Sequence, residues 1–333
     1  MEVKKIKNKL FSKNDLTFEE SSSLFELIMT GKLNEIDISA ILISLKIKGE
    51  TKNEILGATT IMRSKCLKIS SPDDAVDTCG TGGDMSDTLN ISTAASLVAA
   101  SFGVKITKHG NKSVSSKSGS ADMLEKIGYK FTDDPIKLEK QLKNNNFCFM
   151  FAQYHHAAMK HVINVRKNLG TRTIFNLLGP LTNPANAKNQ LLGVYDKKWL
   201  NTHCEVLKEL DSNKVMIVHG FDGLDEITLS HNTYICELNN KKISSYNFDP
   251  RDIGYNYISL DDIKGGDPRY NADCFMKMIN GEYSQFQKIV EINAGAAIYL
   301  AGKASSIKEG ALLAQKIISE GKTKEFISNI SNE

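Results

Sequence analysis

A glycine-rich stretch between Asp77 and Asp84 has the residue types of an anion-binding loop. It reads Asp-Thr-Cys-Gly-Thr-Gly-Gly-Asp, and a second polar run, Asn-Ile-Ser-Thr, follows at positions 90–93. Three glycines within four positions allow positive φ angles and a close approach of the backbone to a bulky ligand. Backbone N–H groups between a strand and a helix can bind a phosphate. Because the carboxylate of Asp84 would repel a phosphate unless it faced a cation or a sugar hydroxyl, we expect a phosphorylated ligand with a metal-bound or hydroxyl-rich part.

Two familiar phosphate-binding motifs do not match this stretch. A dinucleotide-binding loop would need a third glycine where Met85 stands. A P-loop would need a Gly-Lys-Ser/Thr sequence, which does not follow. A tight turn between a strand and a helix, with no ligand, stays open as an alternative.

A second candidate for anion binding runs from Lys108 to Ser116. It holds two lysines, one glycine, Asn111 and three serines, and it directly follows a predicted strand at 104–107. Such a polar, cationic loop suits a phosphate. In a parallel sheet this loop and the glycine loop would both lie at the carboxyl ends of strands, where ligands bind. The alternative is a solvated surface loop.

The sequence Asp222-Gly223-Leu224-Asp225-Glu226 is a candidate metal site. Adjacent carboxylates suit Mg²⁺ best when a di- or triphosphate supplies the remaining oxygen ligands. Arg166, on a predicted helix at 159–169, could clamp a carboxylate bidentately. The alternatives are an ordinary Asp-Gly turn and a surface charge.

The elements that would position these residues change in type along the chain. Residues 1 to about 70 are predicted to be helical, with capping-box spacing at Thr17–Glu20 and Thr51–Glu54. An apolar helix around Ile41 ends at Gly49, and its remaining face predicts either ordinary core or a subunit contact. From residue 75, strands predicted at 75–77, 104–107, 147–151, 191–195 and 214–218 alternate with helices predicted at 92–100, 120–127, 135–142, 156–169 and 198–210. This alternation predicts an α/β fold with a parallel sheet covered on both faces. Hairpin or mixed-edge strands are expected at 226–260, and helices from 272 onward.

Composition limits the function classes. The 333 residues carry 42 Lys and Arg against 39 Asp and Glu, so a net charge of +3 gives no argument for nucleic acid or a membrane surface. The six cysteines have no metal or redox spacing, which predicts reduced thiols. The polar N-terminal segment is unlike a signal peptide, and no apolar run reaches transmembrane length. We therefore expect a cytoplasmic protein without membrane or nucleic-acid partners.

The motifs together resemble a known family. The glycine loop, residues 90–93, Lys108–Asn111, Asn176–Pro184 and Asp222–Glu226 occur in an order that closely resembles the anthranilate phosphoribosyltransferases of tryptophan biosynthesis. The resemblance covers nearly the whole chain. It implies transfer of phosphoribosyl from 5-phospho-α-D-ribose 1-diphosphate to the amine of anthranilate, with Mg²⁺ as cofactor and pyrophosphate as the second product.

The resemblance also implies an architecture. It is a small all-helical domain beside a larger α/β domain with a mostly parallel central sheet, as in pyrimidine nucleoside phosphorylases. The helical domain would comprise residues 1–72, with return helices from about 166–188, and the donor-binding domain residues 73–165 and 189–333. A homodimer through the helical domains is implied as well.

Residue roles follow from the same resemblance. Mg²⁺ would be held by Ser92, Asp225 and Glu226, and anthranilate would contact Gly80, Asn111 and Arg166. No general base is expected, because an aromatic amine is already neutral at pH 7; Lys108 is the electrostatic candidate. The full set of expected substrate-binding residues is Gly80, Gly83, Asp84, Thr88, Asn90, Ile91, Ser92, Thr93, Lys108, His109, Gly110, Asn111, Lys112, Ser113, Val114, Ser115, Ser116, Ser120 and Arg166.

A departure from the family pattern and two rival functions bear on this assignment. Lys112 stands where the family usually has Arg, which keeps the charge but loses bidentate phosphate geometry. A nucleoside phosphorylase of the same fold is disfavoured by Asp225 and Glu226, which imply a metal-bound pyrophosphate. A nucleic-acid-binding paralogue would need a more basic surface than a net charge of +3 indicates.

Overall fold

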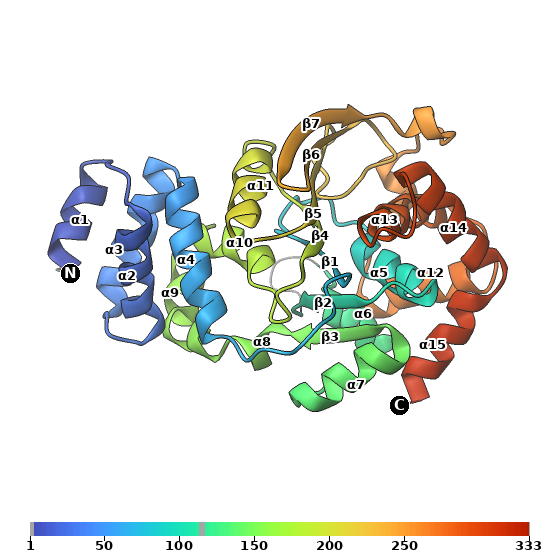
Figure 1. Cartoon of the computed structure of the whole chain (residues 1–333), viewed down its shortest axis with the longest axis horizontal. Helices are drawn as coiled ribbons and strands as arrows, with labels where there is room; N and C mark the ends of the chain where they lie inside the picture. The colour runs from blue at the N-terminus through green and yellow to red at the C-terminus, as the bar shows by residue number, and fades with distance from the viewer. Residues whose placement is uncertain (1–2, 113–116, 333) are drawn as a thin grey trace.

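The computed structural model describes residues 3–112 and 117–332. Its N-terminal helices form a bundle at one end of the molecule, drawn in blue in Figure 1. At Thr17 the predicted capping box is confirmed, because Glu20 N–H donates to Thr17 Oγ1 (3.2 Å) and Thr17 N–H donates to Glu20 Oε2 (2.9 Å). The helices of this bundle are α1 (Val3–Phe11), α2 (Phe18–Met29), α3 (Glu35–Lys48) and α4 (Lys52–Lys65).

A seven-stranded sheet forms the centre of the remaining chain. The strand order is β3-β2-β1-β4-β5-β6-β7; the first five strands are parallel, and β6 and β7 are antiparallel. This confirms the predicted mostly parallel sheet and the predicted hairpin, whose turn residues Asn240 and Lys241 have positive φ. The strands are β1 (Val76–Gly80), β2 (Ile106–Gly110), β3 (Phe147–Phe151), β4 (Asn189–Gly193), β5 (Lys214–Gly220), β6 (Thr233–Asn239) and β7 (Lys242–Phe248).

Helices cover both faces of the sheet, as the alternation predicts (Figure 1). They are α5 (Ile91–Ser101), α6 (Ser120–Lys126), α7 (Pro135–Asn145), α8 (Ala152–His155), α9 (Ile163–Leu169), α10 (Ile174–Leu178), α11 (Trp199–Glu209), α12 (Pro268–Ile279), α13 (Gln285–Leu300), α14 (Ile307–Ser319) and α15 (Lys322–Asn332). Four short 3₁₀ helices are described at Ala157–His161, Gly179–Leu181, Pro250–Ile253 and Leu260–Ile263. Among the described helices, none is long and apolar enough to cross a membrane.

Successive residues of the strands point to opposite faces of the sheet and pack into two separate hydrophobic cores. On β5, Met216 and Val218 join the core beneath α5 and α13, whereas Val215 and Ile217 face the opposite side. That alternation is the period of two expected for a strand buried on both faces. The second core also contains Phe25 and other side chains of the helical bundle. The bundle therefore shares a core with one face of the sheet, and it contacts α9, α10 and α11 on that side.

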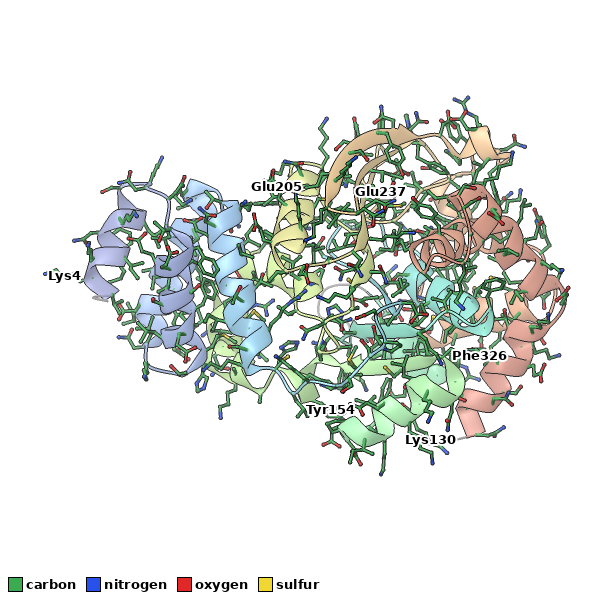
Figure 2. The ribbon with its side chains drawn as sticks, viewed as in Figure 1. Lys4, Lys130, Tyr154, Glu205, Glu237 and Phe326 are labelled. Atoms are coloured by element: carbon green, nitrogen blue, oxygen red, sulfur yellow. The ribbon has the colours of Figure 1, made fainter. Side chains whose placement is uncertain are left out.

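Side chains also tie the antiparallel edge of the sheet to the helical layers. Glu237 of β6 accepts hydrogen bonds from Tyr246 (2.8 Å) on β7 and Tyr299 (2.7 Å) on α13. Glu237 and Glu205 of α11 are both labelled at the upper side of the molecule in Figure 2. The edge strands are thus held by polar contacts as well as by the ladder.

Several sequence predictions were wrong in their boundaries, including the strand predicted at 191–195, which is Asn189–Gly193. β1 continues to Gly80 and β2 to Gly110, so the residues from Lys108 to Gly110 end a strand and do not begin a loop. The ladders extend that far because Gly80 pairs with Gly193 and Gly110 with Phe151. The helix expected at 156–169 is interrupted, since His156 and Val162 have non-helical dihedral angles.

Candidate active site

The carboxyl ends of β1 and β4 form the place where the strand order reverses. Successive strands run outward in opposite directions from this pair, and such a point is where open α/β sheets bind ligands. The last residues of the two strands, Gly80 and Gly193, are paired. A Cβ on Gly80 would lie 2.7 Å from Asp225 Oδ2, and one on Gly193 would lie 1.5 Å from Asp225 O. Two glycines therefore let the loop after β5 lie against this edge.

The glycine loop and the start of α5 hold the two predicted metal carboxylates. Gly82 N–H donates to Asp225 Oδ2 (2.9 Å), and Ser92 N–H donates to Glu226 Oε1 (3.2 Å). Desolvation, with the charge of Asp84 nearby, raises the pKa of Asp225 to about 7. Desolvation and the charge of Asp225 raise the pKa of Glu226 to about 8. Half-buried, mutually repelling carboxyl oxygens suit a hard divalent cation, so these residues fit Mg²⁺.

Lys108 lies beneath this site. Its side chain is nearly inaccessible, at 1% exposure. The ammonium donates to Thr78 O and lies 3.4 Å from Ser92 Oγ. Burial lowers the pKa of Lys108, and the charge of Asp77 opposes that shift. The site therefore contains a buried cation next to the expected metal ligand Ser92.

Asp222 belongs to the predicted metal stretch but is already engaged. Its carboxylate accepts hydrogen bonds from Thr228 Oγ1 (2.6 Å), Ser230 Oγ and Leu224 N–H (3.1 Å). These bonds shape the turn that presents Asp225 and Glu226. The structure thus separates one turn-forming acid from the two acids at the sheet edge.

Arg172, which the sequence analysis did not select, also contacts the glycine loop. Its Nη2 donates to Gly83 O, and its Cζ lies 4.1 Å from the centroid of the Tyr195 ring. A Cβ on Gly83 would lie 2.7 Å from Arg172 Nη2. No motif marks Arg172 in the sequence; its only signal is its place six residues after Arg166.

Arg166 lies apart from these contacts. It sits on α9, half-buried, with its Cζ 5.6 Å from the centroid of the Phe175 ring. Burial lowers the pKa of its guanidinium. Within residues 3–112 and 117–332, Arg166 forms no ion pair, so no carboxylate lies within 4.0 Å of its guanidinium.

The other expected binding residues have varied surroundings. Asn90 Oδ1 accepts from Ser118 Oγ (3.1 Å) and from Asn271 Nδ2 (2.8 Å). Exposed Lys112 pairs with Glu125 (2.9 Å), on the surface of α6. Gly110 is the last residue of β2, Ser120 is the first residue of α6, and Asn111 between them is exposed. Ile91 and Thr93 are buried in α5. Thr88 forms an isolated β-bridge with Lys264. The expected residues Ser113, Val114, Ser115 and Ser116 lie outside the described residues.

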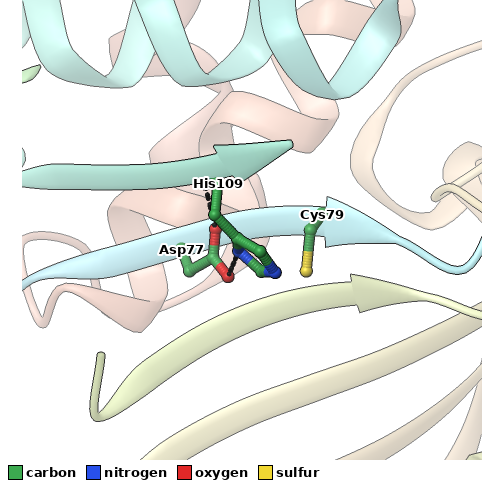
Figure 3. Close-up of side chains that lie close together, drawn as sticks. All are labelled: Asp77, Cys79 and His109. Atoms are coloured by element: carbon green, nitrogen blue, oxygen red, sulfur yellow. Dashed lines mark hydrogen bonds and ion pairs between the residues drawn. The ribbon is translucent and has the colours of Figure 1, made fainter. Parts of the chain in front are cut away.

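His109 turns away from the glycine loop, toward Asp77. Figure 3 shows these two side chains with Cys79 on the neighbouring strands β1 and β2. His109 Nδ1 lies 2.8 Å from Asp77 Oδ2, and Nε2 lies 2.9 Å from Gly179 O. Burial opposes protonation, but the charge of Asp77 raises the pKa of His109 above its usual value. Both ring nitrogens of His109 are therefore engaged by polar groups of the protein.

The three side chains in Figure 3 lie close enough to suggest a metal site. Both ring nitrogens of His109 are already engaged by Asp77 and Gly179 O, and burial raises the pKa of the Cys79 thiol well above its usual value. Gln190 Nε2 also donates to Asp77 Oδ2 (2.9 Å) and to Pro180 O (2.6 Å). The cluster therefore serves to fasten the segment at 179–180 to the sheet and does not fit a metal ion.

Comparison with known families covers most of the chain. Residues 72–324 match the family described as "Glycosyl transferase family, a/b domain". Residues 4–66 match "Glycosyl transferase family, helical bundle domain". Both matches follow the helical and sheet-containing parts seen in the structure.

Individual proteins are similar over almost their full length. An anthranilate phosphoribosyltransferase of Methanobrevibacter smithii is 45% identical, over 95% of this chain and 95% of its own. One from Clostridium beijerinckii is 46% identical, over 93% and 92%. The crystal structure of the Thermus thermophilus enzyme superposes with a TM-score of 0.92 at 35% identity, covering 98% of each chain. A Saccharomyces cerevisiae enzyme in complex with PRPP and Mg has the same fold, with a TM-score of 0.90 at 24% identity over 99% and 97%.

Gly193→Ala tests the close approach of the Asp225 loop. We expect the free energy of unfolding to fall by roughly 1–3 kcal/mol, because the new Cβ must displace the backbone of Asp225. Urea unfolding without ligand measures this. Gly179→Ala is the control, since its Cβ meets nothing within 4 Å, and its stability should change by less than about 0.5 kcal/mol. Wild-type stability in Gly193→Ala would contradict the close approach.

Proposed function

The chain belongs to the anthranilate phosphoribosyltransferase family, and we propose that it binds the phosphoribosyl donor and Mg²⁺ at the edge formed by β1 and β4. The reaction transfers phosphoribosyl from 5-phospho-α-D-ribose 1-diphosphate to the amine of anthranilate, releasing pyrophosphate, in tryptophan biosynthesis. The observation that carries this placement is the contact of Asp225 and Glu226 with the N–H groups of Gly82 and Ser92. This contact supports the proposal, because it brings the proposed metal ligands and the proposed phosphate-binding loop to one point.

The donor would lie across the glycine loop and the start of α5. The N–H groups of Gly83 and Asp84 make no hydrogen bond within the described residues, so they are free to bind phosphate oxygens. Gly82 and Gly83 have φ of 64° and 79°, a backbone conformation that glycine adopts without strain. Gly80, Thr88, Asn90, Ile91, Thr93, Lys108–Ser116 and Ser120 complete the proposed donor site.

Asp225 and Glu226, with Ser92, are the proposed Mg²⁺ ligands. When bound, the ion would neutralise the charge that develops on the leaving pyrophosphate. Lys108 would supply a further fixed positive charge, which costs no reorganisation during the reaction because it is already buried in place.

Arg166 is the proposed partner of the anthranilate carboxylate. A half-buried guanidinium without an ion-pair partner in the described part of the chain can form a charge-assisted, bidentate bond with a carboxylate. Asn111 and Gly80 would contact the same acceptor. Because the amine is neutral, these residues need only hold it in line with C1′ of the donor.

We keep the homodimer as a proposal, with a changed surface. Ile41, on the helix expected to face the partner, is fully buried in the bundle core. On the same helix, Ile36 and Ile47 are 82% and 67% exposed, and Phe11 of α1 is 57% exposed. These side chains support a subunit contact through the helical bundle. The expected cytoplasmic location and the domain boundaries at 72/73, about 166 and 188/189 stay predictions.

The double substitution Asp225→Asn and Glu226→Gln tests the metal assignment. Turnover in saturating Mg²⁺ should fall on the order of 10²-fold or more, because the ion loses its anionic ligands. Formation of phosphoribosylanthranilate, followed by loss of anthranilate fluorescence, measures it. Asp73→Asn with Asp74→Asn changes an equivalent pair of exposed acids and should leave turnover unchanged. Wild-type rates of the Asp225/Glu226 variant, with and without EDTA, would refute the assignment.

Arg166→Ala tests the acceptor site. The KM for anthranilate should rise by about tenfold or more, since a charge-assisted bond to the carboxylate is lost. The KM for the donor should change little. Lys167→Ala, an exposed neighbour on α9, is the control and should change neither constant. A rise confined to the donor constant would show that Arg166 serves the other substrate.

A further inference from the structure

Arg172 contacts the glycine loop, yet the proposed function gives it no role. We propose that Arg172 is a positioning residue of the donor site and that it acts through the peptide of Gly83. This inference rests on the proposed function of the glycine loop. It adds a residue that neither the loop motif nor the family resemblance selected.

The contacts of Arg172 fix it from two sides. Its guanidinium packs over the ring of Tyr195 (4.1 Å to the centroid), just beyond the end of β4, and Nη2 donates to Gly83 O. Tyr195 is itself joined to the loop, because its N–H donates to Thr81 Oγ1 (3.0 Å). The planar guanidinium is thus stacked on one residue while it binds the backbone of another, which a lysine cannot reproduce.

The bond to Gly83 O determines where the next N–H points. In a trans peptide the C=O and N–H directions are opposite, so holding the Gly83 carbonyl toward Arg172 aims Asp84 N–H to the other side of the loop. Within the described residues, that N–H and the N–H of Gly83 donate to no acceptor. Arg172 therefore maintains the orientation of the Gly83–Asp84 peptide, which leaves Asp84 N–H available for a phosphate.

The charge of Arg172 contributes to the same result. Among the described residues it forms no ion pair with a carboxylate. An uncompensated cation beside the loop favours the binding of an anion and reduces the repulsion from Asp225 and Asp84.

The contact between Arg172 and Gly83 can be disrupted from either residue, and this makes the inference testable. A Cβ on Gly83 would lie 2.7 Å from Arg172 Nη2 and would displace the guanidinium. Gly83→Ala and Arg172→Ala should therefore break one and the same interaction. If so, their effects on donor binding are not additive, as for two residues that act as a unit.

The experiment is a double-mutant cycle on donor affinity. The Kd of 5-phospho-α-D-ribose 1-diphosphate with Mg²⁺ is measured by calorimetry, without anthranilate, for wild type, Arg172→Ala, Gly83→Ala and the double variant. We expect each single variant to weaken binding about tenfold and the double variant to bind about as weakly as Gly83→Ala alone. The KM for anthranilate should stay near the wild-type value in Arg172→Ala.

Controls separate this role from general stability. Arg166→Ala combined with Gly83→Ala should give additive effects on donor and acceptor constants, because the two residues share no contact. Melting temperatures without ligand check that each variant folds. If Arg172→Ala does not fold, Arg172→Lys, which keeps the charge but loses the planar fork, replaces it in the same cycle.

Two results would overturn the inference while leaving the proposed function intact. One is additive weakening of donor binding by Arg172→Ala and Gly83→Ala. The other is an unchanged donor Kd in Arg172→Ala, and a change in the anthranilate constant alone would then assign Arg172 to the acceptor. Failure of the wild-type protein to bind donor with Mg²⁺ would instead refute the proposed function, and the inference with it.

Discussion

Repulsion between neighbouring carboxyl groups is the constraint around which the functional edge of this protein is built. Asp225 and Glu226 are adjacent, half-buried and close to Asp84, and their desolvation makes the ionised pair unfavourable without a cation. The surroundings reduce this cost only in part, through one backbone N–H for each carboxylate. Lys108 and Arg172 add positive charge nearby. The remaining cost is what a bound Mg²⁺ would remove, and it explains why so many features of the fold meet at the ends of β1 and β4.

Much of the fold could be predicted from the sequence because local patterns and tertiary packing agree. The apolar run at 147–151 is the strand β3 within the same bounds, and the Asn240 turn joins β6 to β7. The strand ends could not be predicted, since Lys108 and His109 are polar and look like loop residues. Their place in β2 depends on pairing with β3, which only the assembled sheet provides.

Site residues that belong to a sequence motif could be predicted. Residues that matter because distant parts of the chain approach each other closely could not. The glycine loop, Asp225 and Glu226 form recognisable strings. Gly193 and Arg172 do not: Gly193 matters because the backbone of Asp225 lies against it, and Arg172 because it contacts Gly83 across 89 positions of sequence. Asp222 shows the converse, because it belongs to the motif but its carboxylate serves the turn.

Proton release on metal binding tests the central claim most directly. Calorimetric titration of the donor-bound protein with Mg²⁺, in two buffers of different ionisation enthalpy at pH 6 and pH 8, measures both affinity and protons. With pKa values of about 7 and about 8 for Asp225 and Glu226, both acids hold protons at pH 6 and must lose them to bind the ion. The account predicts proton release beyond that of donor with Mg²⁺ alone, and an affinity that rises about tenfold per pH unit for each proton released. An affinity independent of pH, with no excess proton release, would contradict it.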